Sequence, residues 1–308
     1  MAPKKDRKIT KAIIAAAGYG TRFLPATKNQ PKEMLPIIDK PIIHYLVEEA
    51  VNSGISDIIL VTRAGNHIME DYFDNHSELE HTLEETGKLD RLQMIRDIPQ
   101  MANFIYVRQK KHLPYGNASP LLAVKDLIDD DESIVFMFGD DVTITDNPKP
   151  VTKQLIDIFE KEKPSAVVAV QHVSDDQVHK YGTVRYKDPT GKSYEISEQV
   201  EKAPLGKNPS NMAVYGRYIL SYDFFEKIQS TPIGIGGELW VTDVINGMAQ
   251  DGKKILAPPV DGEWLTTGDP MNFIKTTLKM AMRRDDLSKE VLDFLQELKH
   301  NYTNEGSN

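Results

Sequence analysis

Residues 15–36 read Ala-Ala-Ala-Gly-Tyr-Gly-Thr-Arg-Phe-Leu-Pro-Ala-Thr-Lys-Asn-Gln-Pro-Lys-Glu-Met-Leu-Pro. The alanines end an apolar segment, residues 12–17, whose composition predicts a buried β-strand. Because glycine has no Cβ, a turn at Gly18 and Gly20 lets backbone amides approach a bound phosphate closely. Arg22 and Lys32 add two cations on a segment that prolines stiffen. The stretch therefore predicts a polyphosphate-binding loop after the first strand.

Strand and helix patterns alternate outward from this loop, which predicts an α/β fold with a mostly parallel, Rossmann-like sheet. Continuous apolar runs, typical of strands buried on both faces, occupy residues 57–62, 103–107, 133–138 and 166–173. Helical patterns occupy residues 41–54, 120–127 and 151–162.

The predicted main domain, residues 9–285, includes a smaller part of different character. Short strand patterns at 182–186, 194–201 and 214–220 predict an antiparallel sub-domain at about residues 175–235. Residues 77–100 are charged and helical in pattern, which predicts a surface excursion.

The last segment, residues 286–308, is predicted to be an amphipathic helix and a tail. One helical face gathers the apolar residues Leu287, Val291, Leu292, Leu295 and Leu298. We expect this face to pack on its own domain, and docking on a partner subunit is the alternative.

Composition narrows the class of protein. The 308 residues, 40% of them hydrophobic, can bury a substantial core in one large domain or two small ones, and no apolar run is long enough to span a membrane. The basic residues 1–8 are expected to form a solvated, disordered tail. The chain has no cysteine, which excludes disulfides and thiolate metal sites and favours a cytoplasmic location. The net charge of −9 argues against nucleic acid as a partner.

Two other classes of phosphate loop do not fit. A P-loop requires Gly-Lys-Ser/Thr, whereas Gly20 is followed by Thr21 and Arg22. A dinucleotide fingerprint requires a third small residue where this chain has Phe23, which disfavours a dinucleotide-dependent oxidoreductase. An ordinary turn would explain the two glycines alone, but not the Thr-Arg and Pro-Lys-Glu-Met-Leu-Pro that accompany them.

Asp140 and Asp141 follow the predicted strand at 133–138. Ligands of open α/β sheets bind outside the carboxyl ends of the strands, where this pair is expected to lie. Carboxylate oxygens suit Mg²⁺, a hard cation that shares its coordination with substrate phosphates. A turn with a helix cap would explain two aspartates equally well in isolation, but the neighbouring phosphate loop favours the metal site.

Together these segments resemble the sugar-1-phosphate nucleotidylyltransferases. The wording Phe-Leu-Pro-Ala-Thr-Lys, followed by Pro-Lys-Glu-Met-Leu-Pro, is similar to the bacterial UTP–glucose-1-phosphate uridylyltransferases in particular, and the resemblance continues to about residue 285. It implies that UTP and glucose-1-phosphate yield UDP-glucose and pyrophosphate by in-line attack on the α-phosphate, with Mg²⁺ as cofactor. It also implies a cytoplasmic role in polysaccharide biosynthesis. We expect a homodimer or homotetramer.

The resemblance further implies roles for single residues. The expected catalytic residues are Arg22, Lys32, Asp140 and Lys202, with Asp140 as the metal ligand. The expected nucleotide-binding residues are Ala16, Ala17, Gly18, Gly20, Thr21, Gln109 and Gly116. Gln109 offers both a donor and an acceptor to the uracil ring. The expected sugar-binding residues are Gly182, Glu201 and Asn211, which makes the smaller sub-domain the sugar-binding part. Arg217, Tyr218 and Asp243 match as well, but a structural role explains them equally well.

Two segments depart from the family's pattern. Thr266 stands where relatives carry a second metal-binding Asp, and Asp269, three residues later, is a candidate substitute. In the segment 113–120, Tyr115 and Asn117 replace residues that lie near the base and sugar in relatives. Two alternatives therefore stay open. The enzyme could use another nucleotide or sugar, or the chain could be a nucleotide-sugar-binding or regulatory protein with weakened or lost catalysis.

Overall fold

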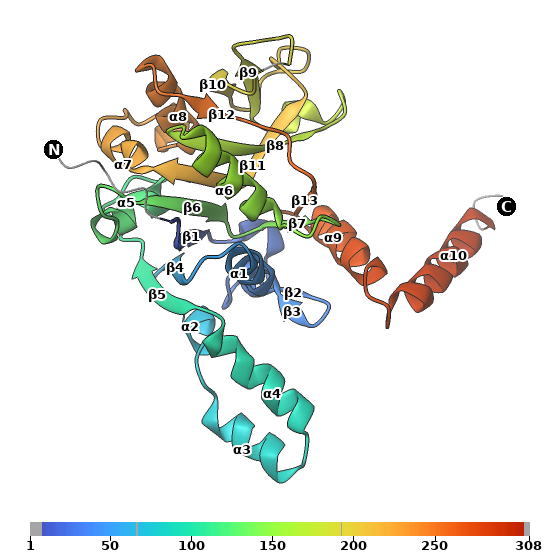
Figure 1. The fold of residues 1–308 in the computed structure, drawn as a ribbon. Coiled ribbons are helices and arrows are strands. Elements are labelled where there is room, and N and C mark those ends of the chain that lie inside the picture. The colour runs from blue at the N-terminus through green and yellow to red at the C-terminus, as the bar shows by residue number, and fades with distance from the viewer. Residues whose placement is uncertain (1–7, 66, 192, 305–308) are drawn as a thin grey trace.

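The computed structural model describes residues 8–65, 67–191 and 193–304 (Figure 1). The predicted tail at residues 1–8 lies outside these ranges except for Lys8. A nine-stranded sheet with the path β10-β9-β11-β6-β1-β4-β5 forms the centre, and β8 and β12 join it through β11.

The parallel part of the sheet carries the phosphate loop. It comprises β1 (Lys11–Ala16), β4 (Asp57–Thr62), β5 (Asn103–Arg108) and β6 (Ser133–Phe138). Strand β1 pairs in parallel with both β4 and β6, and β4 pairs in parallel with β5. The predicted mostly parallel sheet is confirmed, and the carboxyl ends of these strands meet at one edge.

The antiparallel part extends the same sheet. Strand β11 (Met212–Ser221) lies between β6 and β8 (Ala166–His172), and β12 (Ile255–Leu256) pairs with β8. At the other end of β11, β9 (Thr183–Tyr186) pairs with β10 (Ile196–Val200). The strand predicted at 214–220 is thus part of β11 inside the main sheet, whereas β9 and β10 form the antiparallel edge.

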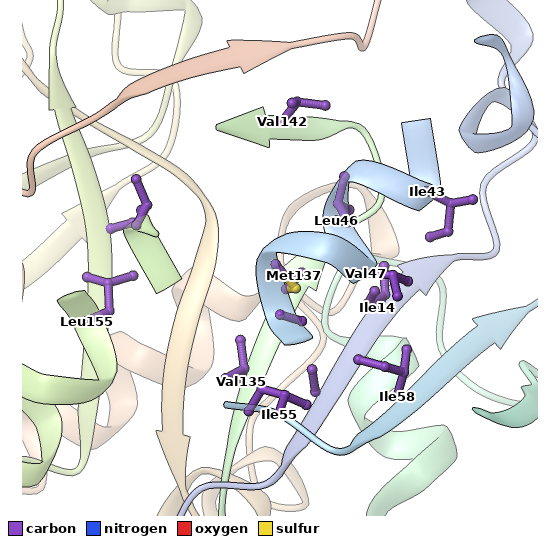
Figure 2. Packing of buried hydrophobic residues seen from close by; sticks show 14 of the residues in the cluster. Ile14, Ile43, Leu46, Val47, Ile55, Ile58, Val135, Met137, Val142 and Leu155 are labelled. Carbon is purple, nitrogen blue, oxygen red and sulfur yellow. The ribbon is translucent and has the colours of Figure 1, made fainter. Parts of the chain in front are cut away.

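Helices cover both faces of the sheet because successive strand residues point to opposite sides. One face holds α1 (Ile42–Asn52) and α6 (Val151–Glu162), and the other holds α5 (Ser119–Val124), α7 (Tyr222–Ile228) and α8 (Val241–Gln250). Ile14 belongs to the first core and its neighbour Ile13 to the second. Figure 2 shows the first core, in which Leu46 and Val47 of α1 lie over Ile14.

Two helical segments extend from this body (Figure 1). The first contains α2 (Ile68–Tyr72), α3 (Ser77–Glu85) and α4 (Leu89–Asp97), which confirms the predicted surface excursion. The second contains α9 (Pro270–Met282) and α10 (Ser288–Asn304). Helix α10 contacts α9, and none of its described side chains is buried. The contact with α9, which lies within residues 9–285, agrees with the expectation that α10 packs on its own domain, although its apolar face stays partly exposed.

Short elements complete the fold. Two small antiparallel sheets pair β2 (Pro36–Ile37) with β3 (Lys40–Pro41), and β7 (Asp141–Ile144) with β13 (Glu263–Thr266). Short 3₁₀ helices are η1 (Thr21–Phe23), η2 (Lys32–Met34), η3 (Ile98–Gln100), η4 (Lys125–Leu127), η5 (Val178–Lys180) and η6 (Ile235–Gly237). Within the described ranges, no helix has the length and hydrophobicity needed to cross a membrane.

Candidate active site

The loop after β1 makes its turn at Gly20, which has the left-handed φ of 60°. A Cβ there would lie 3.2 Å from both the Lys32 and the Thr27 side chains, so glycine suits the position for space as well as conformation. The Thr27 hydroxyl donates a 2.8 Å hydrogen bond to the Gly20 carbonyl and fixes the turn. The loop thus returns on itself and brings Lys32 back toward the end of β1.

Lys32 meets Asp140 at this edge of the sheet. The Lys32 Nζ lies 2.5 Å from Asp140 Oδ2. Burial would lower the pKa of Lys32, but the negative charge and hydrogen bond of Asp140, together with the charges of Glu33 and Asp141, outweigh it and the pKa is raised. The amide of Gly139 donates to the Ala15 carbonyl (3.0 Å), and a Cβ on Gly139 would lie 2.6 Å from that oxygen. Glycine therefore lets Asp140 follow directly beside the phosphate loop.

Two cavities adjoin at Asp140. The first, of about 290 Å³, is lined by Ala17, Gly18, Lys32, Gln109 and Gly116 among others. The second, of about 500 Å³, is lined by Arg22, Gly182, Glu201 and Lys202 among others. Asn117, Phe138 and Asp140 line both cavities. The structure therefore brings the predicted catalytic residues and most of the predicted nucleotide and sugar residues to one composite site.

The second cavity carries the predicted sugar contacts. A Cβ on Gly182 would lie 2.8 Å from Glu201 Oε2, so the glycine lets this carboxylate lie against backbone. Burial raises the pKa of Glu201, although Lys202 and a hydrogen bond from Thr242 oppose the shift. Lys202 Nζ lies 3.8 Å from Glu201 Oε1 and 6.0 Å from the centre of the Trp240 ring. Glu201 and Lys202 thus place a hydrogen-bond acceptor and a cation side by side in this cavity.

Four of the predicted residues lie elsewhere. Ala16 is buried at the end of β1, and Gly20 and Thr21 form the turn rather than the lining of the first cavity as the described residues define it. Asn211 is outside the described lining of the second cavity, and its Nδ2 donates to Asp175. Arg22 does line that cavity, and its Nη1 donates to the Gly268 carbonyl at 3.2 Å.

The two departures from the family's pattern have structural counterparts. A Cβ on Gly268 would lie 3.1 Å from Asp140 Oδ2 and 3.4 Å from Thr266 Oγ1, so both side chains reach the backbone at Gly268, and both line the second cavity. Asp269 caps α9, since its two oxygens accept from the backbone N–H (3.0 Å) and the side-chain amide (2.6 Å) of Asn272. The carboxylate that could replace the missing one is thus already bonded.

The side chains around Asp140 determine which kind of metal ion the site could bind. Among the described residues, no group of three His, Asp or Glu side chains could hold one. Asp140 offers a carboxylate that Lys32 already neutralises, and Thr266 adds a hydroxyl. Such a donor set fits a hard cation that takes most of its ligands from bound phosphates and water.

The loop at 113–119 is joined to the segment before α8. The Leu239 amide donates to the Tyr115 carbonyl (2.7 Å), and the Asn117 Oδ1 accepts from the Val241 amide (2.8 Å). Gly116 has a φ of 130°, and a Cβ there would lie 2.2 Å from the Leu239 carbonyl oxygen. Asn117, which lines both cavities, therefore links the loop at 113–119 to the start of α8.

Sequence reasoning missed Glu33 as part of the site. Its side chain lines the first cavity, is 1% exposed and has one oxygen without a hydrogen-bond partner among the described residues. Burial raises the pKa of Glu33 to about 7, against the opposing charge of Lys32. The signal was its place in Pro-Lys-Glu-Met-Leu-Pro, but a charged residue beside a lysine suggests an exposed side chain.

Known proteins resemble this chain over nearly all of its length. A family model described as Nucleotidyl transferase matches residues 11–283. UTP–glucose-1-phosphate uridylyltransferase 2 from Staphylococcus saprophyticus is 43% identical, over 96% of this chain and 100% of its own length. A solved UTP-bound UGPase from Acinetobacter baumannii is 34% identical, with a TM-score of 0.85 over 94% of this chain and 99% of that one. A solved UDP-glucose pyrophosphorylase complexed with UDP-glucose is 36% identical, with a TM-score of 0.78 over 90% of this chain and 100% of that one. These matches confirm the resemblance inferred from residues 15–36, and the chain belongs to the nucleotidyl transferase family.

Proposed function

We propose that this protein is a UTP–glucose-1-phosphate uridylyltransferase that forms UDP-glucose and pyrophosphate. The observation that carries the proposal is the composite site, in which the Lys32–Asp140 pair adjoins both cavities. One cavity offers glycine amides and Gln109, and the other offers Glu201 and Lys202. The names of the relatives and of their bound ligands support the same substrates.

The reaction needs no nucleophile from the protein. A phosphate oxygen of glucose-1-phosphate forms a bond to the α-phosphorus of UTP, and the bond from that phosphorus to the pyrophosphate oxygen breaks. Catalysis then consists of positioning two anions and offsetting their charge. We assign Arg22 and the loop amides to the departing pyrophosphate, Lys32 to the reacting phosphate and Lys202 to the sugar phosphate. Glu201 accepts hydrogen bonds from sugar hydroxyls.

Nucleotidyl transferases generally use a divalent metal ion, and we propose Mg²⁺ here, held by Asp140. When bound, the ion would neutralise phosphate charge. The hydroxyl of Thr266 is a weaker ligand than the carboxylate that it replaces, so the substrate phosphates would supply more of the coordination.

The remaining expectations stay proposals of the same kind. Residues 9–285 would form the catalytic domain, with the sugar bound by the part at about 175–235 and the helix and tail at 286–308 outside it. We further propose a homodimer or homotetramer that acts in the cytoplasm, and the absence of cysteine from the sequence agrees with that location.

The test is to incubate the purified protein with UTP, glucose-1-phosphate and MgCl₂ and to measure UDP-glucose by chromatography. We expect UDP-glucose and pyrophosphate in equal amounts, and a smaller rate with dTTP. Asp140→Asn should fold normally and lose about 10²–10³ in turnover, since it removes the carboxylate that would hold the metal ion whose charge offsets that of the phosphates. Tight UTP binding with no product in any nucleotide–sugar combination would favour the non-catalytic alternative instead.

A further inference from the structure

Arg217 is a charged residue in the middle of the core. It lies on β11, its side chain is 0% exposed, and its Nη2 is 2.7 Å from Glu49 Oε2. The Glu49 side chain, on α1, is 9% exposed. Burying two charges costs free energy that their attraction often fails to recover, so a buried ion pair calls for an explanation beyond stability.

Glu49 joins this pair to a third element. Its Oε1 accepts from the Thr152 hydroxyl at 2.6 Å and from the Thr152 amide at 3.2 Å, at the start of α6. Burial would raise the pKa of Glu49, but the charge and hydrogen bonds of Arg217, together with hydrogen bonds from Thr152 and Thr143, outweigh it and the pKa is lowered. The carboxylate therefore stays ionised and holds the guanidinium fixed between α1, α6 and β11.

The remaining donors of Arg217 reach the chain next to Asp140. The Nη2 donates to the Asp141 carbonyl at 2.6 Å, and the Nη1 donates to the Gly216 carbonyl at 2.9 Å. In return, the Gly216 amide donates to Asp141 Oδ2 at 2.8 Å. A Cβ on Gly216 would lie 2.7 Å from that same oxygen, so the glycine permits the contact. Asp141 is thus held through both its backbone and its side chain.

Thr267 holds the turn at Asp140 from the opposite side. The Asp140 carbonyl accepts from the amide and the hydroxyl of Thr267, each at 2.8 Å. Backbone groups of three successive residues, 139 to 141, are therefore fixed by hydrogen bonds, while the Asp140 carboxylate faces Lys32 and both cavities. Glu49 and Arg217 lie outside the lining of both cavities as the described residues define them.

Resting on the proposed function, we infer that Arg217, held by Glu49, is a positioning residue that fixes the direction of the Asp140 carboxylate through the Asp141 carbonyl. It touches no substrate in this arrangement. A misplacement of about 1 Å at a reacting centre can cost about 10²-fold in rate. Loss of the pair should therefore lower turnover and weaken metal binding, while the nucleotide cavity keeps its shape.

The main variant replaces both charges at once, as Glu49→Gln with Arg217→Met, so that no unpaired charge stays buried. Such replacements are often neutral for stability. We expect kcat to fall by about tenfold to a hundredfold, with the KM for UTP within about threefold of the parent. Binding of Mn²⁺ to the UTP complex, followed by electron paramagnetic resonance, should weaken by about tenfold, which corresponds to about 1.4 kcal/mol.

Two further variants make the test decisive. Lys11→Met with Glu132→Gln removes another partly buried pair (2.6 Å), at the amino ends of β1 and β6, and should change the melting temperature only. Arg217→Lys keeps the positive charge but lacks the planar fork that reaches both Glu49 and the Asp141 carbonyl, so it should share the metal-binding defect. It also serves as the test if the double variant does not fold.

The readouts separate this inference from the proposed function. If the parent makes no UDP-glucose but the variants still bind Mn²⁺ more weakly in the UTP complex, the positioning role stands and the proposed function fails. If the parent is active, and the folded variants keep both its kcat and its Mn²⁺ affinity, the pair is only structural and the inference is overturned.

Discussion

Among single residues, Thr266 has the clearest chemical consequence. Thr266 lines the same cavity as Asp140, where a second carboxylate would be a stronger ligand for a hard cation than a hydroxyl. We expect Thr266→Asp to lower the Mg²⁺ concentration needed for half-maximal activity by about tenfold, because Mg²⁺ favours sites with one or two carboxylates. The measurement is a Mg²⁺ titration of UDP-glucose formation. Thr266→Asn introduces a side chain of nearly the same volume as aspartate but without its charge. It should leave the half-saturating Mg²⁺ concentration near that of the parent.

Glu33 predicts how stability depends on pH. Its carboxyl has a pKa of about 7 in the folded chain and an ordinary value of 4.5. The folded state therefore holds this proton more tightly than the unfolded state, and the free energy of unfolding should fall as the pH rises from about 5 to 8. The effect is on the order of 3 kcal/mol. Lys32, Asp140 and Arg63 are the charges that act on Glu33.

Urea unfolding at several pH values checks this prediction. Glu33→Gln should remove most of the decline between pH 5 and 8 and should be more stable than the parent at pH 8. The matched control is Glu160→Gln, which changes an exposed carboxylate on α6. A parent and a Glu33→Gln variant with parallel pH profiles would show that Glu33 does not titrate in this range.

At the scale of elements, Asn117 connects the loop after β5 to the first turn of α8 through the Val241 amide. Loss of such a helix-terminal acceptor costs about 1 kcal/mol. Because Asn117 lines both cavities, we expect Asn117→Ala to raise the KM for both substrates, by about fivefold if that free energy is lost from binding. Asn117→Asp keeps the acceptor and should stay within about threefold of the parent. A change in the KM for only one of the two substrates, measured by steady-state kinetics, would contradict a role for Asn117 in both cavities.

The elements that the sequence predicted well are those with local signals. The strands at 57–62 and 133–138 and the helix at 151–162 have the predicted bounds, because a continuous apolar run or a helical period defines each of them. Strand β11 was recognised, but its antiparallel place between β6 and β8 depends on partners far away in the chain. For the same reason the sequence showed Arg217 as a motif residue, while its partner Glu49 on α1 was not foreseen.

The residues of the candidate site were likewise predictable only in part. Lys32, Asp140, Gln109 and Glu201 were predicted from motifs, and the structure brings them to adjoining cavities. Asn211 matched the family's sequence pattern, yet it lies outside the described lining of the second cavity and donates a hydrogen bond to Asp175. A motif identifies residues close in sequence, but only the fold decides which of them face the cavity.

At the scale of the whole molecule, α10 extends from the body (Figure 1). It contacts α9, and its described side chains include no buried one. We expect a chain that ends at Arg284 to fold and to keep its melting temperature within about 3 °C, since little apolar area is lost from the core. Differential scanning calorimetry checks the melting temperature, and size-exclusion chromatography shows whether the helix contributes to assembly. Aggregation of the shortened chain would mean that α10 covers a surface the body cannot expose.

Strands β9 and β10 lie at one margin of the sheet and are joined to it through the end of β11. The groups that fix the Asp140 turn come instead from β1, from the interior of β11 and from the segment after β13. Because we propose that the sugar binds next to this hairpin, we expect that exchanging it for the hairpin of a relative with a different hexose preference would change carbohydrate selectivity and leave phosphoryl transfer intact.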